Sequence, residues 1–429
     1  MTRRPVDVII VGAGPAGALT ALLLARSGVD VLLLDRAAFP RAKACGDCLS
    51  LGATALLRRT GLLDRLLESP HARLRGWRIV APDGAAFDAH FGAAGAARID
   101  PRSSRTRSRE SSNADDFASC ALSVERAIFD ALLVEAALAA GARFEQESVT
   151  DLQYDARGRV CGVRTRTGSI RARLTVGADG LRSVVATRLD ARAAPGALRK
   201  LSLTFHVPVD GVRAAGEMHV GRGVCAGVAP VDSHGRCNLT LVADAPRFGR
   251  SAAADARVLA YDAFQSLPLL RGRVRRSALR DASWLASGPF DRPGRRVAFD
   301  GAVLIGDAAG YYDPFTGQGV YQALTCAELL APAILSALDS GDLRAASFTG
   351  YSRARSRLLR GARFVQRGID HVLRRPATAN RAIARIRRAP EFARAIISVT
   401  GDVAPVRSLF SPRTLSGLLL PTAIPENTV

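Results

Sequence analysis

Two cysteines, Cys45 and Cys48, lie three positions apart in the stretch RAKACGDCLS at residues 41–50. This spacing occurs in zinc sites and in redox disulfides. A structural zinc site needs a second pair of cysteine or histidine ligands, and the remaining cysteines offer none at the required spacing. A redox pair of the thioredoxin type would follow the first strand of its fold, whereas this pair follows the second apolar segment. The sequence therefore predicts neither a metal site nor a redox disulfide.

The first 36 residues contain the parts of a dinucleotide-binding unit. A short apolar strand, VDVIIV, runs into a glycine-rich turn and a helix, and a second strand, VDVLLLD, ends at Asp35. Glycines in the turn allow a tight bend, a close approach to pyrophosphate and close packing of helix on strand, while Asp35 can accept hydrogen bonds from a ribose. The helix N-terminus favours phosphate. The turn residues with these roles are Gly12, Gly14, Pro15, Ala16 and Gly17.

The same N-terminal run resembles a signal peptide or a membrane span in its apolar length. Its glycines and proline fit a strand–turn–helix better, and we find no other stretch long enough to cross a bilayer. Seven scattered cysteines, an odd number, indicate a reducing compartment rather than a disulfide framework. We therefore expect a cytoplasmic protein that contacts membranes at most peripherally.

Two later segments distinguish FAD from a nicotinamide nucleotide. Residues 174–185, LTVGADGLRSVV, read as a strand that reaches Asp179, and residues 301–324, GAVLIGDAAGYYDPFTGQGVYQAL, read as a strand that ends at Gly306-Asp307. A loop rich in proline and glycine follows, and a helix begins near Gly319. With the N-terminal motif, these segments resemble those of FAD-dependent oxidoreductases of the aromatic-hydroxylase superfamily over residues 6–355.

The resemblance implies a non-covalently bound FAD and gives several residues a role. Asp307 would hold the ribityl chain, although a helix N-cap is an alternative role for this side chain. The following loop would lie beside the isoalloxazine, and the helix would direct its positive end at flavin N1 and O2, where reduced flavin is negative. The residues placed here by the resemblance are Gly306, Asp307, Pro314, Gly317, Gly319 and Val320.

Four further FAD contacts are expected from the same resemblance. Arg126 leads an amphipathic helix and would reach the FAD from the side, the alternative being a solvated arginine at a helix start. Val149, at the end of the next strand, would touch adenine through its backbone. Asp179 and Arg36 complete the expected set.

The stretch around Cys45 is similar to that of the geranylgeranyl reductase branch, which carries Lys-x-Cys-Gly after the ribose acid. Lys43, Cys45 and Gly46 match this pattern, which places Cys45 near the flavin as the candidate proton donor and makes Cys48 incidental. Residues 224–230, VCAGVAP, lack the aromatic residues that the branch carries there, which leaves a prenyl substrate open. The chain has two tryptophans and no double-Trp motif of flavin-dependent halogenases, so halogenation is not expected.

The predicted fold is α/β, with a Rossmann-type FAD-binding domain, an inserted antiparallel β-sheet substrate domain and a helical C-terminal extension. The motifs are dispersed, so the FAD-binding domain must be discontinuous, over residues 1–75, 118–199 and 286–355. Residues 76–117 and 200–285 would form the substrate domain, with a mobile loop at residues 101–116. His206, His219 and His234 lie there at no metal-binding spacing and are interpreted as core or surface residues.

Residues 356–429 are basic, with apolar residues at helical spacing and arginines on the other faces. They would form a helical cap on the FAD-binding domain or a surface that contacts an anionic membrane. The net charge of +21 suits an anionic partner, and the base composition of a GC-rich genome explains it equally well. The arginine–serine run at residues 101–116 has no interleaved aromatic residues, so no nucleic-acid partner is expected.

The combined signals favour a FAD-dependent reductase that saturates a carbon–carbon double bond of a lipophilic, isoprenoid or polyketide-like substrate. The alternative is a FAD-dependent monooxygenase that hydroxylates an aromatic or polyketide-like compound. A third hypothesis is an electron-transfer flavoprotein that docks on a membrane, although the sequence has no iron–sulfur cysteine cluster. NAD(P)H is the expected electron donor.

Overall fold

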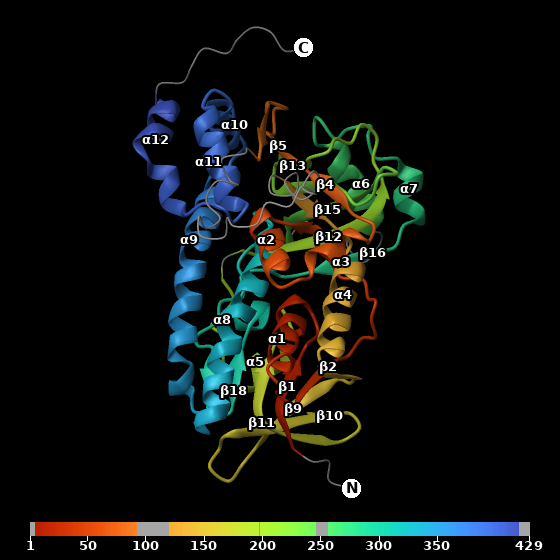
Figure 1. Cartoon of the computed structure of the whole chain (residues 1–429). Helices are drawn as coiled ribbons and strands as arrows, with labels where there is room; N and C mark the ends of the chain where they lie inside the picture. The colour runs from red at the N-terminus through yellow and green to blue at the C-terminus, as the bar shows by residue number, and fades with distance from the viewer. Residues whose placement is uncertain (1–4, 92–119, 197, 246–255, 420–429) are drawn as a thin grey trace, which may run out of the picture.

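The computed structural model describes residues 5–91, 120–196, 198–245 and 256–419. A lower domain with a parallel sheet and an upper domain with a larger sheet lie one above the other, and the C-terminal helices run along both (Figure 1). The loop predicted at residues 101–116 lies outside the described residues.

The lower domain is built on a parallel sheet with the strand order β18-β11-β1-β2-β8. This is the Rossmann order, in which the chain begins at the centre and winds first to one side and then to the other. The central strand β1 is buried at five of its six residues, as its β-branched composition predicts. The strands are β1 (Val6–Val11), β2 (Val31–Asp35), β8 (Arg143–Gln146), β11 (Ser169–Gly177) and β18 (Ala302–Leu304), with β17 (Ala298–Phe299) antiparallel to β18.

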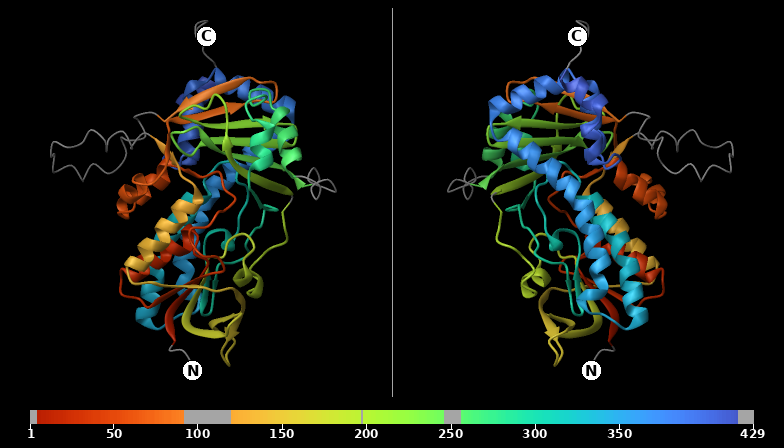
Figure 2. Two further views of the ribbon diagram at one scale, coloured as in Figure 1. Left: turned by 90° about the vertical axis from the view of Figure 1, so that its right-hand side faces the viewer. Right: turned by 90° about the vertical axis from the view of Figure 1, so that its left-hand side faces the viewer.

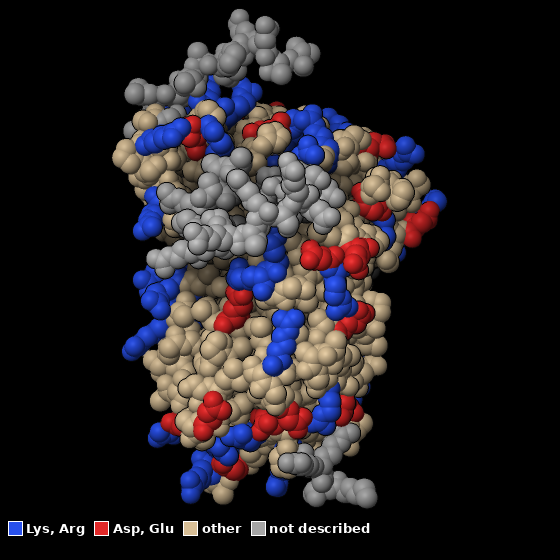
Figure 3. Space-filling view, viewed as in Figure 1, with Lys and Arg blue, Asp and Glu red and all other residues tan. Residues whose placement is uncertain are grey.

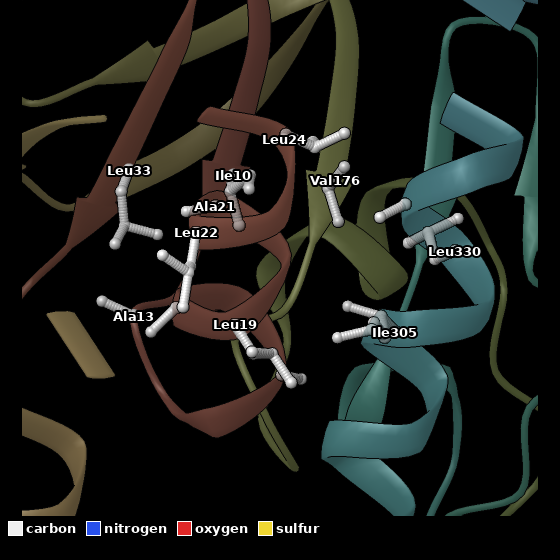
Figure 4. Packing of buried hydrophobic residues seen from close by; sticks show 14 of the residues in the cluster. Ile10, Ala13, Leu19, Ala21, Leu22, Leu24, Leu33, Val176, Ile305 and Leu330 are labelled. Carbon is white, nitrogen blue, oxygen red and sulfur yellow. The ribbon is translucent and has the colours of Figure 1, made fainter. Parts of the chain in front are cut away.

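Helix α1 (Pro15–Ala25) packs on this sheet and contacts α4 (Arg126–Ala139) on one side and α8 (Gly319–Ser340) on the other. Figure 4 shows Leu19 and Leu22 of α1 in one cluster with Ile10 and Val176 of the sheet and Leu330 of α8. Each such fully buried side chain contributes about 1.5–3 kcal/mol relative to exposure. A Cβ atom at Gly17 would overlap the carbonyl oxygen of Gly12, so glycine is required where helix meets strand.

Two smaller sheets complete the lower domain. Strands β9 and β10 form an antiparallel extension of β11, and β3, β7 and β4 form a three-stranded sheet between the domains. Their bounds, with the nearby helices, are β3 (Cys48–Leu49), α2 (Leu51–Arg59), α3 (Leu63–Leu67), β4 (Ala72–Leu74), β7 (Ala121–Ser123), β9 (Val149–Tyr154), β10 (Val160–Thr165) and α5 (Val184–Arg188).

The upper domain is a seven-stranded sheet with the order β16-β12-β15-β14-β13-β5-β6. Its strands are β5 (Gly76–Val80), β6 (Ala86–His90), β12 (Lys200–Pro208), β13 (Gly216–Gly221), β14 (Val224–Pro230), β15 (Arg236–Asp244) and β16 (Trp284–Ser287), and it also carries α6 (Ala256–Gln265) and α7 (Arg276–Asp281). The antiparallel prediction fails at one pair, because β5 runs parallel to β13. The β5–β6 hairpin comes from an early segment of the chain and adds to the edge of a meander formed much later.

The C-terminal helices cover the upper sheet rather than the lower domain alone (Figure 2). Helix α9 (Thr349–Leu373) packs on α8, whereas α10 (Pro376–Arg387) and α11 (Pro390–Thr400) contact β6. Ile383 and Ile397 share a buried cluster with Phe87. The chain then continues through η6 (Val406–Phe410) and α12 (Pro412–Leu419). The predicted domain boundary at residue 355 falls inside α9, and the helical cap extends to the substrate domain.

Helix α8 is long and apolar enough to cross a bilayer, so the prediction that no further stretch has that length is wrong. It is the one such helix among the described residues. Ten of its residues are buried in the core against α1, α2 and α9. A helix that is apolar on most of its faces has this composition whether it is covered by protein or by lipid.

Asp402 joins the C-terminal region to the lower domain. Its carboxylate accepts hydrogen bonds from the Ser50 hydroxyl at 2.7 Å and from the Gln318 side-chain amide at 2.6 Å. Ser50 caps α2, and Gln318 precedes α8. Burial raises the pKa of Asp402 to about 7, and these two hydrogen bonds offset only part of that effect.

We expect the Asp402→Asn variant to be more stable than the wild type at alkaline pH. An aspartate has an unfolded pKa of about 3.9, so the folded protein binds this proton more tightly and loses stability as the pH rises through about 7. The variant lacks this ionisation. Its free energy of unfolding relative to the wild type should increase by on the order of 3 kcal/mol between pH 5 and pH 8.

Urea unfolding of both proteins at the two pH values measures this difference. Asp281→Asn, at an exposed aspartate, is the control and should follow the wild-type pH dependence. Parallel pH profiles for Asp402→Asn and the wild type would contradict the account.

Candidate active site

A cavity of about 960 Å³ lies between the carboxyl ends of the parallel strands and the upper sheet. This is the edge at which open α/β sheets bind nucleotides, and the volume lies in the range of ligand sites. All the predicted site residues except Gly17 line this cavity. They are Gly12, Gly14, Pro15, Ala16, Asp35, Arg36, Lys43, Cys45, Gly46, Arg126, Val149, Asp179, Gly306, Asp307, Pro314, Gly317, Gly319 and Val320.

The glycine-rich turn forms one end of the cavity. Gly12 has φ +101°, and a Cβ atom there would overlap the backbone at Ala178. Gly14 instead faces open space, since the nearest atom to a Cβ at this position would be Nη2 of Arg41 at 3.7 Å. The backbone N–H of Ala13 donates to the Asp35 carboxylate at 2.9 Å, which fixes that acid at the end of β2. The turn therefore offers a cradle at Gly14 with an acid beside it.

Arg41 closes this cradle, and sequence reasoning missed it. Its guanidinium lies 4.8 Å from the centre of the Phe39 ring and forms ion pairs with Asp130 at 3.3 Å and Asp35 at 3.7 Å. Its Nε is buried and has no hydrogen-bond partner in the described structure. A buried, unpaired donor beside an open glycine is the arrangement that a phosphate oxygen would satisfy. The signal available in the sequence was an arginine shortly after the ribose acid.

Arg126 is mostly covered rather than solvated, so the alternative interpretation of this residue is wrong. Its guanidinium donates to the Asp130 carboxylate through Nε at 2.7 Å and Nη2 at 2.8 Å. Both Asp130 and the Cys45 thiol contact it, and its side chain is 11% exposed. Arg126 therefore links α4 to the loop that carries Cys45.

Two aspartates expected at the FAD differ in what their carboxylates do. The Asp179 carboxylate accepts from the Ser183 hydroxyl and from the backbone N–H of Val184 at 2.6 Å, so it binds the first turn of α5, whose N-cap is Ser183. Asp307 makes no side-chain hydrogen bond to another described residue. Asp179 is thus engaged at the start of a helix, whereas Asp307 remains available to a ligand.

Val149 begins β9 and does not end the preceding strand, because β8 stops at Gln146. It nevertheless reaches the cavity wall through the turn between the two strands. Arg36 lies beyond Asp35 and is exposed at the rim of the cavity. Both positions are therefore compatible with contact to the outer end of a nucleotide.

The charge distribution supports an anionic ligand at this end. Burial lowers the pKa of Lys43, and the nearby Arg41 and Arg126 lower it further. Burial raises the pKa of Asp307, although Lys43 and Arg126 act in the opposite direction. A pyrophosphate placed among the three cationic groups would relieve their mutual repulsion. The residues present therefore fit FAD.

The loop between Cys45 and Cys48 is attached to the upper sheet through Asp47. Asp47 is buried at φ +56°, and its Oδ2 accepts from the Asn238 amide at 2.7 Å and lies 2.6 Å from Nε2 of His206. Its Oδ1 accepts from the backbone N–H of Arg126 at 3.2 Å. His206 is therefore part of this buried network and not an isolated core or surface residue. Spacing in the sequence gave no sign of these partners.

The far end of the cavity is mainly apolar and is formed by the upper sheet. Its apolar lining includes Trp77, Met218, Val220, Val224, Val228, Val242 and Phe290. A cluster of three charged side chains lies at one side of this apolar end, where Nζ of Lys200 contacts Asp313 at 3.2 Å and Asp370 at 2.8 Å. Asp313 belongs to the predicted flavin loop and Asp370 to α9. Helix α9 thereby contributes to the cavity wall.

We expect the Arg41→Gln variant to bind FAD about tenfold more weakly or worse, because one charge-assisted contact to phosphate is lost. Quenching of flavin fluorescence during titration of the apoprotein measures this affinity. The control is Arg143→Gln, at an exposed arginine of β8 that pairs with Asp30, and it should bind FAD as the wild type does. Equal affinities for all three proteins would remove Arg41 from the FAD site.

The Asp47→Asn variant should be destabilised by about 1–3 kcal/mol, since an amide cannot accept from both sides and leaves one buried donor unpaired. Thermal unfolding with flavin release as a second readout measures the effect. Asp88→Asn, at a partly exposed ion pair with Arg78 on the same sheet, should cost less than about 1 kcal/mol. Equal losses of stability in the two variants would mean that the buried contacts of Asp47 contribute no more than a surface ion pair, which would contradict their role in joining the domains.

Residues 5–367 match a family model described as a FAD binding domain. The chain is 26% identical over 358 residues to digeranylgeranylglycerophospholipid reductase 2 of Methanopyrus kandleri, covering 80% of this chain and 81% of that protein. It is also 26% identical over 362 residues to conditioned medium factor receptor 1 of Dictyostelium discoideum, covering 80% of this chain and 66% of that protein. A stretch of 73 residues, 17% of each chain, is 51% identical to menaquinone reductase of Mycobacterium tuberculosis.

Solved structures share the fold over nearly the whole chain. The flavin-dependent brominase Bmp2 has a TM-score of 0.73 at 18% identity and covers 93% of this chain and 94% of its own. PqsL of Pseudomonas aeruginosa, described as a probable FAD-dependent monooxygenase, has a TM-score of 0.62 at 20% identity and covers 97% of this chain and all of its own. The resemblance to the superfamily, and to its geranylgeranyl reductase branch, is confirmed by these matches. The chain belongs to the FAD binding domain family and is a FAD-dependent oxidoreductase with a Rossmann-type cofactor domain.

Proposed function

We propose that this protein reduces a carbon–carbon double bond of a lipophilic, isoprenoid or polyketide-like substrate. The observation that carries the proposal is the position of Cys45, on a loop between the cationic and the apolar ends of one cavity. An apolar chamber on the sheet side suits a hydrocarbon chain. The relatives named as reductases of digeranylgeranylglycerophospholipid and of menaquinone support a substrate of this kind.

FAD, when bound, would supply a hydride to one carbon of the double bond. The other carbon needs a proton, and we assign its delivery to the Cys45 thiol. Burial raises the pKa of Cys45, and Arg126 only partly opposes this, so the thiol keeps its proton near neutral pH. The Asn238 side-chain amide donates to the carbonyl oxygen of Cys45 at 2.7 Å, which holds the loop in place. A general acid must be both protonated and positioned, and the raised pKa and the fixed loop of Cys45 support this role.

NAD(P)H is the electron donor in this proposal. The chain has one Rossmann glycine motif, and the FAD-binding unit uses it. The reduced nicotinamide would therefore bind transiently, without a second domain of this type. Anaerobic mixing with NADH or NADPH, followed by flavin bleaching, identifies the donor.

A monooxygenase is the second candidate, and the fold shared with PqsL favours it. The two functions differ when the reduced protein meets oxygen. In rapid-mixing experiments, a reductase should return to the oxidised flavin spectrum in one phase. A transient species with a third absorbance spectrum, whose lifetime increases when an aromatic substrate is present, would favour the monooxygenase over the reductase.

We expect the Cys45→Ser variant to retain FAD and to lose turnover by about 10²-fold or more, the usual contribution of a general acid. Turnover would be measured as loss of the double bond in geranylgeranyl lipids and prenylated naphthoquinones by mass spectrometry. Cys161→Ser, on β10 and outside the cavity, is the matched control. Full turnover by Cys45→Ser would remove the thiol from the mechanism.

A further inference from the structure

Two phenylalanines stand out on the surface of the C-terminal region. Phe364 on α9 is 59% exposed, and Phe410 at the end of η6 is 54% exposed. Their ring centres lie 6.0 Å apart, so the two rings form one apolar feature on the outside of the molecule. Burying such a pair in the core or against α8 would have been favourable by several kcal/mol. Exposed aromatic side chains that gather in one place mark an interaction surface more often than single ones do.

Arginines surround this pair. Arg360 and Arg367 lie one helical turn before and after Phe364, and Arg357 lies two turns before it, all on the same face of α9. Arg407 precedes Phe410 by three residues in a 3₁₀-helix, in which such residues project in the same direction. All four arginines are exposed. We call the two phenylalanines and these four arginines the aromatic–arginine patch.

The positive charge of this region is not neutralised by its own acids. Residues 356–419 contain thirteen arginines and three carboxylates, a net charge of +10. Each carboxylate already has a partner, since Asp370 binds Lys200 and Arg374, Glu391 binds Arg394 and Arg413, and Asp402 binds Ser50 and Gln318. The four arginines of the patch form no ion pair with any residue of the described ranges, and the guanidinium of Arg367 lies 5.8 Å from the centre of the uncharged Tyr312 ring. Figure 3 shows the basic side chains along the edge formed by α9.

We propose that the aromatic–arginine patch docks on the surface of an anionic lipid bilayer. Aromatic rings partition into the interfacial layer of a bilayer, and arginines beside them bind anionic headgroups. The combination of both on adjoining faces of α9 and η6 matches this partner. A second copy of the chain would bring two strongly positive surfaces together. A nucleic acid would be bound in a basic groove with stacked bases, whereas these rings lie against each other.

Docking would place the cavity close to the bilayer. Leu373 and Arg374, at the end of α9, line the cavity and lie nine and ten residues after Phe364. At the rise of an α-helix this is a distance of about 14 Å along the axis. Transfer of a lipophilic substrate from the bilayer to the cavity rests on the proposed function, whereas docking itself does not.

Co-sedimentation of the full-length holoprotein with vesicles tests the proposal, with flavin absorbance as the tracer. Vesicles of phosphatidylcholine alone are compared with vesicles that contain phosphatidylglycerol, at low and at physiological salt. We expect binding to the anionic vesicles at low salt, weakened by salt, and little binding to the neutral ones. No binding of the wild type to anionic vesicles at low salt would overturn the proposal.

Two double variants locate the contact. Phe364→Ser with Phe410→Ser tests the rings, and Arg360→Gln with Arg367→Gln tests the charge, each expected to lower the partition coefficient about tenfold or more. The matched charge control is Arg164→Gln with Arg171→Gln on the exposed edge of the lower domain, and Tyr154→Ser controls for loss of an exposed ring. These controls should bind as the wild type does. Equal binding by all variants would place the contact elsewhere and reject the patch.

Two further outcomes would also overturn the proposal. If a single-stranded oligonucleotide binds as tightly as anionic vesicles do and its binding falls in both patch variants, the partner is a nucleic acid. If light scattering shows a dimer that the patch variants convert to a monomer, the occupant is a second copy of this chain. None of these readouts depends on turnover, so failure of the reductase proposal would leave the result interpretable.

Discussion

The buried carboxylate of Asp47 is the interaction on which the shape of the cavity depends. Ionised carboxylates only accept hydrogen bonds, and three donors converge on this one from α4, β12 and β15. A charged group without partners would be very costly at this depth. The loop that carries Cys45 is therefore held by residues of both domains, with Asn238 and His206 supplied by the upper sheet.

Two other ionisable side chains, those of Lys200 and Asp402, also link distant segments of the chain through hydrogen bonds and ion pairs. Burial alone would lower the pKa of Lys200, but Asp313 and Asp370 raise it, so the side chain stays charged and holds the loop at Asp313 to α9. Asp402 holds the start of α2 and the start of α8 to the C-terminal region. In each of these two sets of contacts, the partners are more than 80 residues apart in the chain. The cavity wall is thus fixed by contacts between distant segments, and the C-terminal helices are part of it.

That separation in the chain explains what the sequence could and could not predict. Gly12, Gly17 and Asp35 lie within one strand–turn–helix–strand unit, so spacing alone predicted where they lie, and the Rossmann order of the sheet is typical of the same local pattern. Asn238 and His206 both bind Asp47, about 160 to 190 residues earlier, and periodicity in the sequence does not predict such a contact. The different contacts of Asp179 and Asp307 could not be predicted from the sequence either. Both follow a strand near a helical turn, and only the folded structure reveals which carboxylate binds the start of a helix.

The parallel pairing of β5 with β13 was unpredictable for a related reason. Alternation of apolar and polar residues identifies a strand, but it does not reveal the direction of the neighbour that the strand will join. The β5–β6 hairpin joins a sheet whose other strands come more than 100 residues later. Its partner is chosen by the packing of two layers, including the C-terminal cluster of Ile383 and Ile397 with Phe87.

The chemistry open to Cys45 depends on Asp130, which does not touch it. Arg126 lies beside the thiol, and an unpaired guanidinium there would favour the thiolate, a nucleophile and a redox-active species. The Asp130 carboxylate is fully buried and holds Arg126 through two short hydrogen bonds, so much of that positive charge is already compensated. Burial then determines the outcome and raises the pKa of Cys45. A ligand that fills the cavity would exclude more water and strengthen the same preference. The arrangement therefore keeps a proton on the sulfur, which a reductase of double bonds can use and a disulfide oxidoreductase cannot.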